Sequence, residues 1–163
     1  MKTRLLAIAA IILIAGALIL GRAPTRVAAD DPWWDTLWGY RVAVSVAAAA
    51  VERQEKTAEL EVNFTALLDS VGESGKFEID SLRVVEVVDG EVVNDRTPFQ
   101  FDRAADYDAN NNAAGTLIIL LTGPTPGDGV RRYHVYFDVV GDAFDPPKIT
   151  NRVSVDTITD LYG

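Results

Sequence analysis

Residues 84–93 carry the sequence Val-Val-Glu-Val-Val-Asp-Gly-Glu-Val-Val, and this stretch decides the fold class. Valine is enriched in strands, and the pair Asp89-Gly90 accepts the positive φ angles of a two-residue type I′ turn. Two apolar runs separated by such a pair are typical of a β-hairpin. We therefore expect two antiparallel strands joined at Asp89-Gly90.

The same preference for strands continues on both sides of this hairpin. Apolar residues occupy every second position in residues 42–46, 60–64 and 133–139. Because a strand places alternate side chains on opposite faces, this period predicts three strands with one buried face each. The polar residues of the last stretch, among them His134, are expected to face solvent.

Four further elements complete the prediction. Residues 117–121 form a continuous apolar run bounded by glycines, which is typical of a strand buried on both faces. Residues 98–101 and 149–155 are further strand candidates. A short helical turn is expected over residues 65–71, because Asn63 or Thr65 can cap its start and Gly72 suits a left-handed end.

Residues 46–58 allow two interpretations. They lack Gly and Pro and are rich in Ala, Glu, Gln and Lys, which are good helix formers. The alternative is a strand, an exposed loop and a second strand.

Together these elements predict an all-β protein, an antiparallel β-sandwich that is jelly-roll-like or immunoglobulin-like and has one short helix. The sandwich domain is expected to span residues 30–145. Residues 146–163 are expected to form either its last strand or the start of a missing domain.

The first 29 residues are typical of an export signal. Lys2 and Arg4 precede an apolar run over residues 5–20, and the small residues 27–29 supply a cleavage site. The run is short for a membrane span, so we expect a cleaved signal peptide, with an uncleaved N-terminal anchor as the alternative. Either way the rest of the chain is expected to be extracellular or on the cell surface.

Composition excludes several classes of function. The 163 residues include 24 acidic and 15 basic ones, which gives a formal net charge of −9. An acidic surface repels phosphate backbones, so no nucleic-acid partner is expected, and a membrane is expected only through an uncleaved N-terminal segment. The chain has no Cys and a single His, so it offers no thiol nucleophile and no pair of imidazoles for a metal.

Residues 34–41 have the sequence Trp-Asp-Thr-Leu-Trp-Gly-Tyr-Arg. This stretch resembles the opening of uncharacterised secreted domains that begin Trp-x-x-x-Trp-x-Tyr-Arg before a first strand. Such domains lie N-terminally in larger bacterial and archaeal surface proteins, often beside glycan-active or lectin-like sandwiches. The similarity extends over about residues 33–140, and it implies a non-catalytic β-sandwich outside the cell.

The aromatic opening is the first candidate site. Trp33, Trp34, Trp38 and Tyr40 could stack on sugar rings as a ligand platform, because indole faces suit that contact. The alternative is that these rings plug one end of the sandwich, since Trp is highly buried on average. Trp38 is expected to be the plug, and Trp33 the ring with the better chance of exposure.

A second candidate is a loop with oxygen-bearing side chains at alternate positions, Asp106, Asp108 and Asn110. Calcium prefers such hard oxygen ligands, so a weak calcium site is one interpretation. The other is an ordinary turn-forming loop, because Asp and Asn favour turns. No other cofactor is expected.

No catalytic group is predicted. His134 has no identifiable nucleophile partner, and the many carboxylates make any single acidic pair uninformative. The expected function is a non-catalytic binding or scaffolding module whose partner is a glycan or a cell-envelope protein. The alternatives are a polysaccharide hydrolase or lyase that uses carboxylates, and a filament subunit that donates residues 30–46 or 148–163 as a strand.

Overall fold

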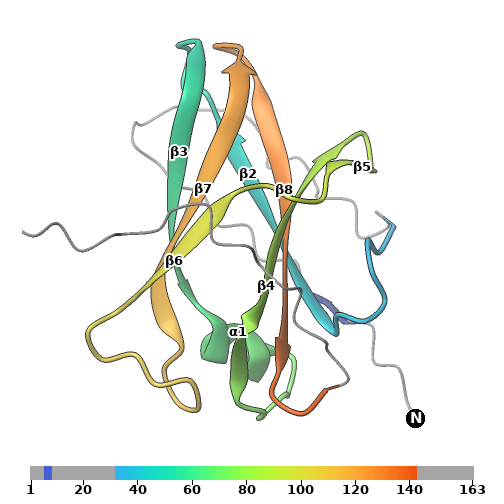
Figure 1. Ribbon diagram of the computed structural model, residues 1–163, viewed down its shortest axis with the longest axis vertical. Coiled ribbons are helices and arrows are strands. Elements are labelled where there is room, and N and C mark those ends of the chain that lie inside the picture. Colours follow the sequence, from blue (N-terminus) through green and yellow to red (C-terminus); the bar gives the residue numbers. More distant parts are fainter. Residues whose placement is uncertain (1–5, 9–31, 143–163) are drawn as a thin grey trace, which may run out of the picture.

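The structure is a computed structural model that describes residues 6–8 and 32–142. Within them the chain forms eight strands and one short helix, arranged as two sheets (Figure 1). The elements are β1 (Leu6–Ile8), β2 (Tyr40–Ala47), β3 (Arg53–Asn63), α1 (Phe64–Ser70), β4 (Phe77–Val88), β5 (Glu91–Asn94), β6 (Phe99–Arg103), β7 (Ala114–Thr125) and β8 (Val130–Val139). The predicted all-β sandwich with one short helix is confirmed.

The chain crosses repeatedly between the two sheets. Sheet A has the order β1-β2-β8-β4-β5, and sheet B has the order β3-β7-β6. All pairs are antiparallel except β1 with β2, where Leu6–Ile8 lies parallel to the first residues of β2. Strand β8 therefore lies at the centre of sheet A, and β7 lies at the centre of sheet B.

The core fills the space between the sheets, and several of its aromatic rings gather at the end covered by α1, which we call the closed end. There Phe64 is fully buried, stacks on Phe77 with ring centroids 4.4 Å apart, and packs against Phe137 at 5.0 Å. Helix α1 covers this end and buries Phe64 and Leu68. Its start is capped as expected, because the Asn63 side chain accepts a hydrogen bond from the Ala66 N–H.

The structure decides two local predictions, the hairpin turn at Asp89-Gly90 and the conformation of residues 46–58. Asp89 and Gly90 have φ angles of 50° and 84°, which confirms the predicted hairpin turn between β4 and β5. Residues 46–58 form the end of one strand, a turn and the start of another, so the helical alternative is wrong there. Pairing of both strands to long neighbours outweighs the helix propensity of this segment.

Two predictions of burial are wrong. Both faces of β8 are buried from Tyr133 to Val139, because β8 is flanked by β2 and β4 and its outer face is covered as well. In β7 only one face is buried. Ile118 and Leu120 stay half-buried, since only the neighbouring side chains of β3 and β6 shield them.

Several predicted segments lie outside the described residues. They are the export segment apart from Leu6–Ile8, the candidate strand at residues 149–155, and the end of the chain from residue 143 onward. In the described part of the chain no helix combines the length and apolar character needed to cross a membrane.

Candidate functional site

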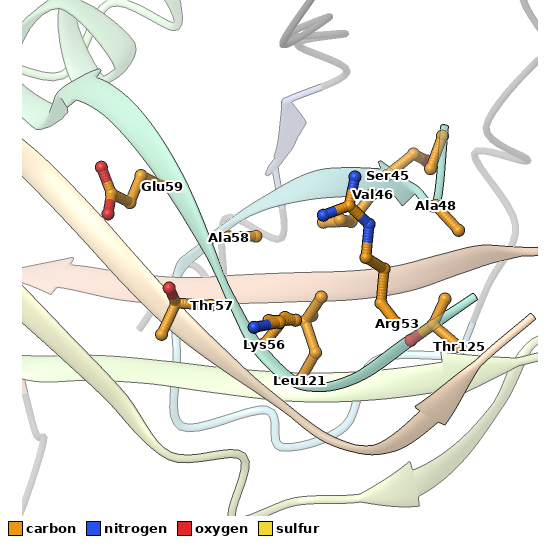
Figure 2. Close-up of a pocket in the computed structure, with 11 residues that line it drawn as sticks. Ser45, Val46, Ala48, Arg53, Lys56, Thr57, Ala58, Glu59, Leu121 and Thr125 are labelled. Atoms are coloured by element: carbon orange, nitrogen blue, oxygen red, sulfur yellow. The ribbon is translucent and has the colours of Figure 1, made fainter. Parts of the chain in front are cut away.

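A cleft of about 350 Å³ opens at the end of the sandwich opposite α1, which we call the open end (Figure 2). It lies between the last residues of β2, the first half of β3 and the last residues of β7, and is lined by Ser45, Val46, Ala47, Ala48, Arg53, Lys56, Thr57, Ala58, Glu59, Leu121 and Thr125. Its size is within the roughly 300–1,000 Å³ of small-molecule sites.

A β-bulge turns two cations toward this cleft. Arg53 pairs with Thr125 and Lys56 pairs with Leu121, and the pairing is irregular between them. Since directly paired residues share a face, Arg53 and Lys56 both lie on the side of sheet B that carries the buried Thr125 and Leu121. At the bulge Glu55 has a φ of 48° and Gly123 a φ of 76°, and the Glu55 carboxylate accepts a hydrogen bond from the Gly123 N–H.

The two cations are exposed and uncompensated by direct contact. Among the described residues neither Arg53 nor Lys56 forms an ion pair or a hydrogen bond through its side chain. Glu59 is the single carboxylate among the described lining residues, and Figure 2 shows it at the other end of the cleft from Arg53. Val46, Ala58 and Leu121 supply an apolar floor between them.

A polar network braces the sandwich beside the cleft. The Arg131 guanidinium donates two hydrogen bonds to Glu86, of 2.7 and 2.8 Å, and a third to the backbone oxygen of Thr122 on β7. It also contacts the hydroxyl of Thr125, which lines the cleft. The hydrogen bonds that Arg131 donates to Glu86 raise the pKa of Arg131, so this third cation stays charged and is paired within the fold.

The aromatic opening forms a separate cluster on the outer face of sheet A. Trp38 is buried against Val85, Val87 and Tyr136, and its indole N–H donates a 2.6 Å hydrogen bond to the backbone oxygen of Ser81. The sheet therefore carries a small second core on the face that points away from sheet B.

Trp33 and Trp34 are half-buried at the border of this cluster. The Trp34 N–H donates to the Tyr136 hydroxyl at 2.9 Å, and the Arg41 guanidinium lies 4.6 Å from the centre of the Trp33 ring. Tyr40 is elsewhere, because its side chain is in the main core, stacks with Phe137 and donates a hydrogen bond to Glu73. The structure thus brings the three tryptophans together and places Tyr40 on the opposite face of β2.

A buried carboxylate fastens the aromatic segment to β8. Asp138 is 1% exposed and accepts hydrogen bonds from the Gly39 N–H at 2.9 Å and from the N–H of Val139. Burial, with a hydrogen bond and repulsion from Asp142, raises the pKa of Asp138 to about 6.

The predicted calcium loop is held by its own hydrogen bonds. One oxygen of the Asp108 carboxylate accepts from the Asn110 N–H and the other from the Asn111 side chain, and these bonds lower the pKa of Asp108. The Asn112 side chain donates to the backbone oxygen of Asp106. The described residues contain no group of three or more His, Asp or Glu side chains placed to hold a metal. The calcium assignment of Asp106, Asp108 and Asn110 stays a prediction, and the turn-forming interpretation accounts for these contacts.

His134 is 4% exposed, so its predicted position at the solvent-facing surface is wrong. It belongs to the buried outer face of β8, between Ala43 on β2 and Val85 on β4, with Tyr136 at 6.2 Å.

The sequence did not indicate Arg53 and Lys56 as a pair. In a regular strand, residues three apart lie on opposite faces of the sheet. Arg53 and Lys56 share a face only because the bulge lies between them. The Gly123-Pro124 pair on the facing strand is the signal that could have suggested an irregularity, because glycine inside a strand often marks a bulge. No protein-family model, curated protein sequence or solved structure matches this chain.

Proposed function

We propose that this protein is a non-catalytic binding module that works outside the cytoplasmic membrane and holds a glycan or a cell-envelope partner. The observation that carries the proposal is the cleft at the open end, a preformed concave site that combines an apolar floor with hydroxyl and cationic side chains. Such a combination is typical of sites that bind a small polar ligand.

The distribution of carboxylates favours binding over hydrolysis. Glycoside hydrolysis by carboxylates needs two of them, roughly 5–9.5 Å apart, on either side of the bond that is cut. The described lining of the cleft offers Glu59 alone. Asp138, the carboxylate with a raised pKa, is buried at the aromatic segment and is occupied by two backbone N–H groups. The export-type segment and the resemblance to secreted sandwich domains support the location.

The filament alternative keeps one supporting observation. Residues 40–46 belong to β2 and pair with β8, so they are already used within the fold. The other edge of β2 accepts Leu6–Ile8 as a parallel strand, which is the contact that an added strand makes. Light scattering of the chain without residues 1–29 tests this alternative, because a filament subunit polymerises as its concentration rises.

A pull-down on immobilised polysaccharides tests the main proposal. We expect the protein to be retained and to release no new reducing ends during the incubation. New reducing ends would contradict the non-catalytic assignment. Loss of retention after Ala58→Trp, a change at a half-buried residue that lines the cleft, with retention kept after Leu37→Trp at an exposed position of the aromatic segment, would assign the bound glycan to the cleft.

A further inference from the structure

The charged rim of the cleft indicates the chemical class of its ligand. Arg53 and Lys56 lie on one wall of the cleft and are exposed, so their charged groups are accessible to a ligand. Arg131 pairs with Glu86, but Arg53 and Lys56 have no carboxylate at hydrogen-bonding distance among the described residues. Two cations held on one wall by a bulge, in a chain of formal net charge −9, form a site for an anion.

We propose that the cleft binds an acidic sugar, with Arg53 and Lys56 holding its carboxylate or sulfate group. This assignment rests on the proposed function of a glycan-binding module. Arginine presents a planar fork of donors that matches the two oxygens of a carboxylate or a sulfate, and lysine adds a point charge beside it. In Figure 2 the Arg53 side chain extends from β3 toward Ser45 and Val46 of β2. A ligand in the cleft would therefore lie beside its guanidinium group.

The remaining lining suits a sugar ring. Val46, Ala58 and Leu121 form an apolar floor that can contact the C–H face of a ring, while Thr125, on the inner face of sheet B, carries a hydroxyl for its hydroxyl groups. The floor and the cations lie in one cleft, so a single acidic residue of a glycan can reach both.

The shape of the edge favours a sugar over a protein strand. β3 is the edge strand of sheet B, but the positive φ of Glu55 interrupts its row of backbone groups. A bulge of this kind hinders the addition of another strand. A densely charged polyanion is disfavoured by the acidic surface around the cleft, whereas a short acidic oligosaccharide adds few charges.

Calorimetric titration of the full chain with matched oligosaccharides tests this assignment. The probes are a trimer of galacturonic acid, its methyl ester, which keeps the rings and removes the charges, and a sulfated and a neutral galactose oligosaccharide of the same length. We expect the acid to bind at least about tenfold more tightly than its ester, and added salt to reduce that difference. Tighter binding of the sulfated galactose oligosaccharide than of the neutral one would show that a sulfate can take the place of the carboxylate.

Substitutions then locate the charge recognition. Arg53→Gln and Lys56→Gln should each weaken binding of the acid by about tenfold and leave binding of the ester nearly unchanged. Arg96→Gln removes the same charge from an exposed position in the loop between β5 and β6, and should change neither. All three positions are exposed, so each variant should keep the melting temperature of the parent protein. An unchanged melting temperature shows that a loss of binding does not come from a loss of folding.

Each outcome decides one of the two proposals. Equal binding of acid, ester and neutral sugars would overturn the acidic-sugar assignment and leave the glycan-binding module standing. Acid binding that survives the double substitution Arg53→Gln and Lys56→Gln would also overturn it, because the anion would then lie elsewhere. Binding of none of the four probes would overturn the acidic-sugar assignment, and the pull-down on immobilised polysaccharides would then decide the glycan-binding module separately.

Discussion

The two ends of this sandwich differ in the kinds of side chain that lie between the sheets. At the closed end stacked phenylalanines and α1 fill the space between the sheets, and Leu60 and Val62 of β3 are buried. At the open end the same strand is exposed from Arg53 to Thr57, and charged and hydroxyl groups replace the apolar ones. The two halves of β3 therefore differ in role. The second half packs in the core and stabilises the fold, and the first half is exposed and accessible to a ligand.

The largest effect should come from the closed end. Phe64→Ala removes a fully buried ring that contacts Phe77 and Phe137, so we expect a loss of about 3–5 kcal/mol in the free energy of unfolding. Val51→Ala at the open end, where the side chain is exposed, should change it by less than about 0.5 kcal/mol. Chemical denaturation measures the free energy of unfolding of each variant. Equal losses would contradict the difference between the two ends.

The second core on sheet A should matter nearly as much. Trp38→Ala removes a buried indole and its hydrogen bond to Ser81, and a loss of about 3 kcal/mol is expected. The control is Leu37→Ala, because Leu37 is 57% exposed next to it. An unchanged melting temperature for Trp38→Ala would show that the aromatic segment is dispensable for folding and would favour a ligand platform there.

The pH dependence of stability should reveal the carboxylate that fastens this segment. The pKa of Asp138 is raised to about 6 in the folded protein, above its ordinary value near 4. The folded state therefore holds the proton more tightly, and the stability that this group provides is full below about pH 4 and is lost as pH rises to about 6. Asp138→Asn should remove this part of the decline, measured by denaturation at several pH values.

Asp142→Asn provides the check on that interpretation. It removes the neighbouring carboxylate that raises the pKa of Asp138, so the decline should shift to lower pH. The same pH profile for all three proteins would assign the decline to other acidic residues.

A smaller effect is expected from the polar brace at the open end. Glu86→Gln weakens the pair with Arg131 and should cost about 1–2 kcal/mol of stability, since both side chains are mostly but not fully buried. Replacing both, Glu86→Leu with Arg131→Met, should recover most of this loss, because apolar pairs often substitute well for buried ion pairs. If the double variant is as unstable as the single one, the brace is needed for the open end to form.

The sequence predicts much of the fold because the signals for its turns, helix cap and strands lie within a few residues of one another. The Asp89-Gly90 turn, the Asn63 cap and the alternation in β2 and β3 are each visible within a few residues of sequence. His134 was misplaced because burial of the outer face of β8 depends on sheet order and on segments distant in sequence. The cleft was missed for the same reason, since the inward position of Arg53 depends on a bulge opposite Gly123.

The most direct test of the account is a nuclear magnetic resonance titration with the galacturonic acid trimer. If the trimer binds in the cleft, amide signals should shift for Ser45–Ala48, for Arg53–Glu59 and around Leu121 and Thr125, which surround it. The indole N–H signals of Trp33, Trp34 and Trp38, on the opposite side of sheet A, should remain in place. Shifts confined to those indoles, with the cleft signals unchanged, would contradict the account and assign the ligand to the aromatic segment.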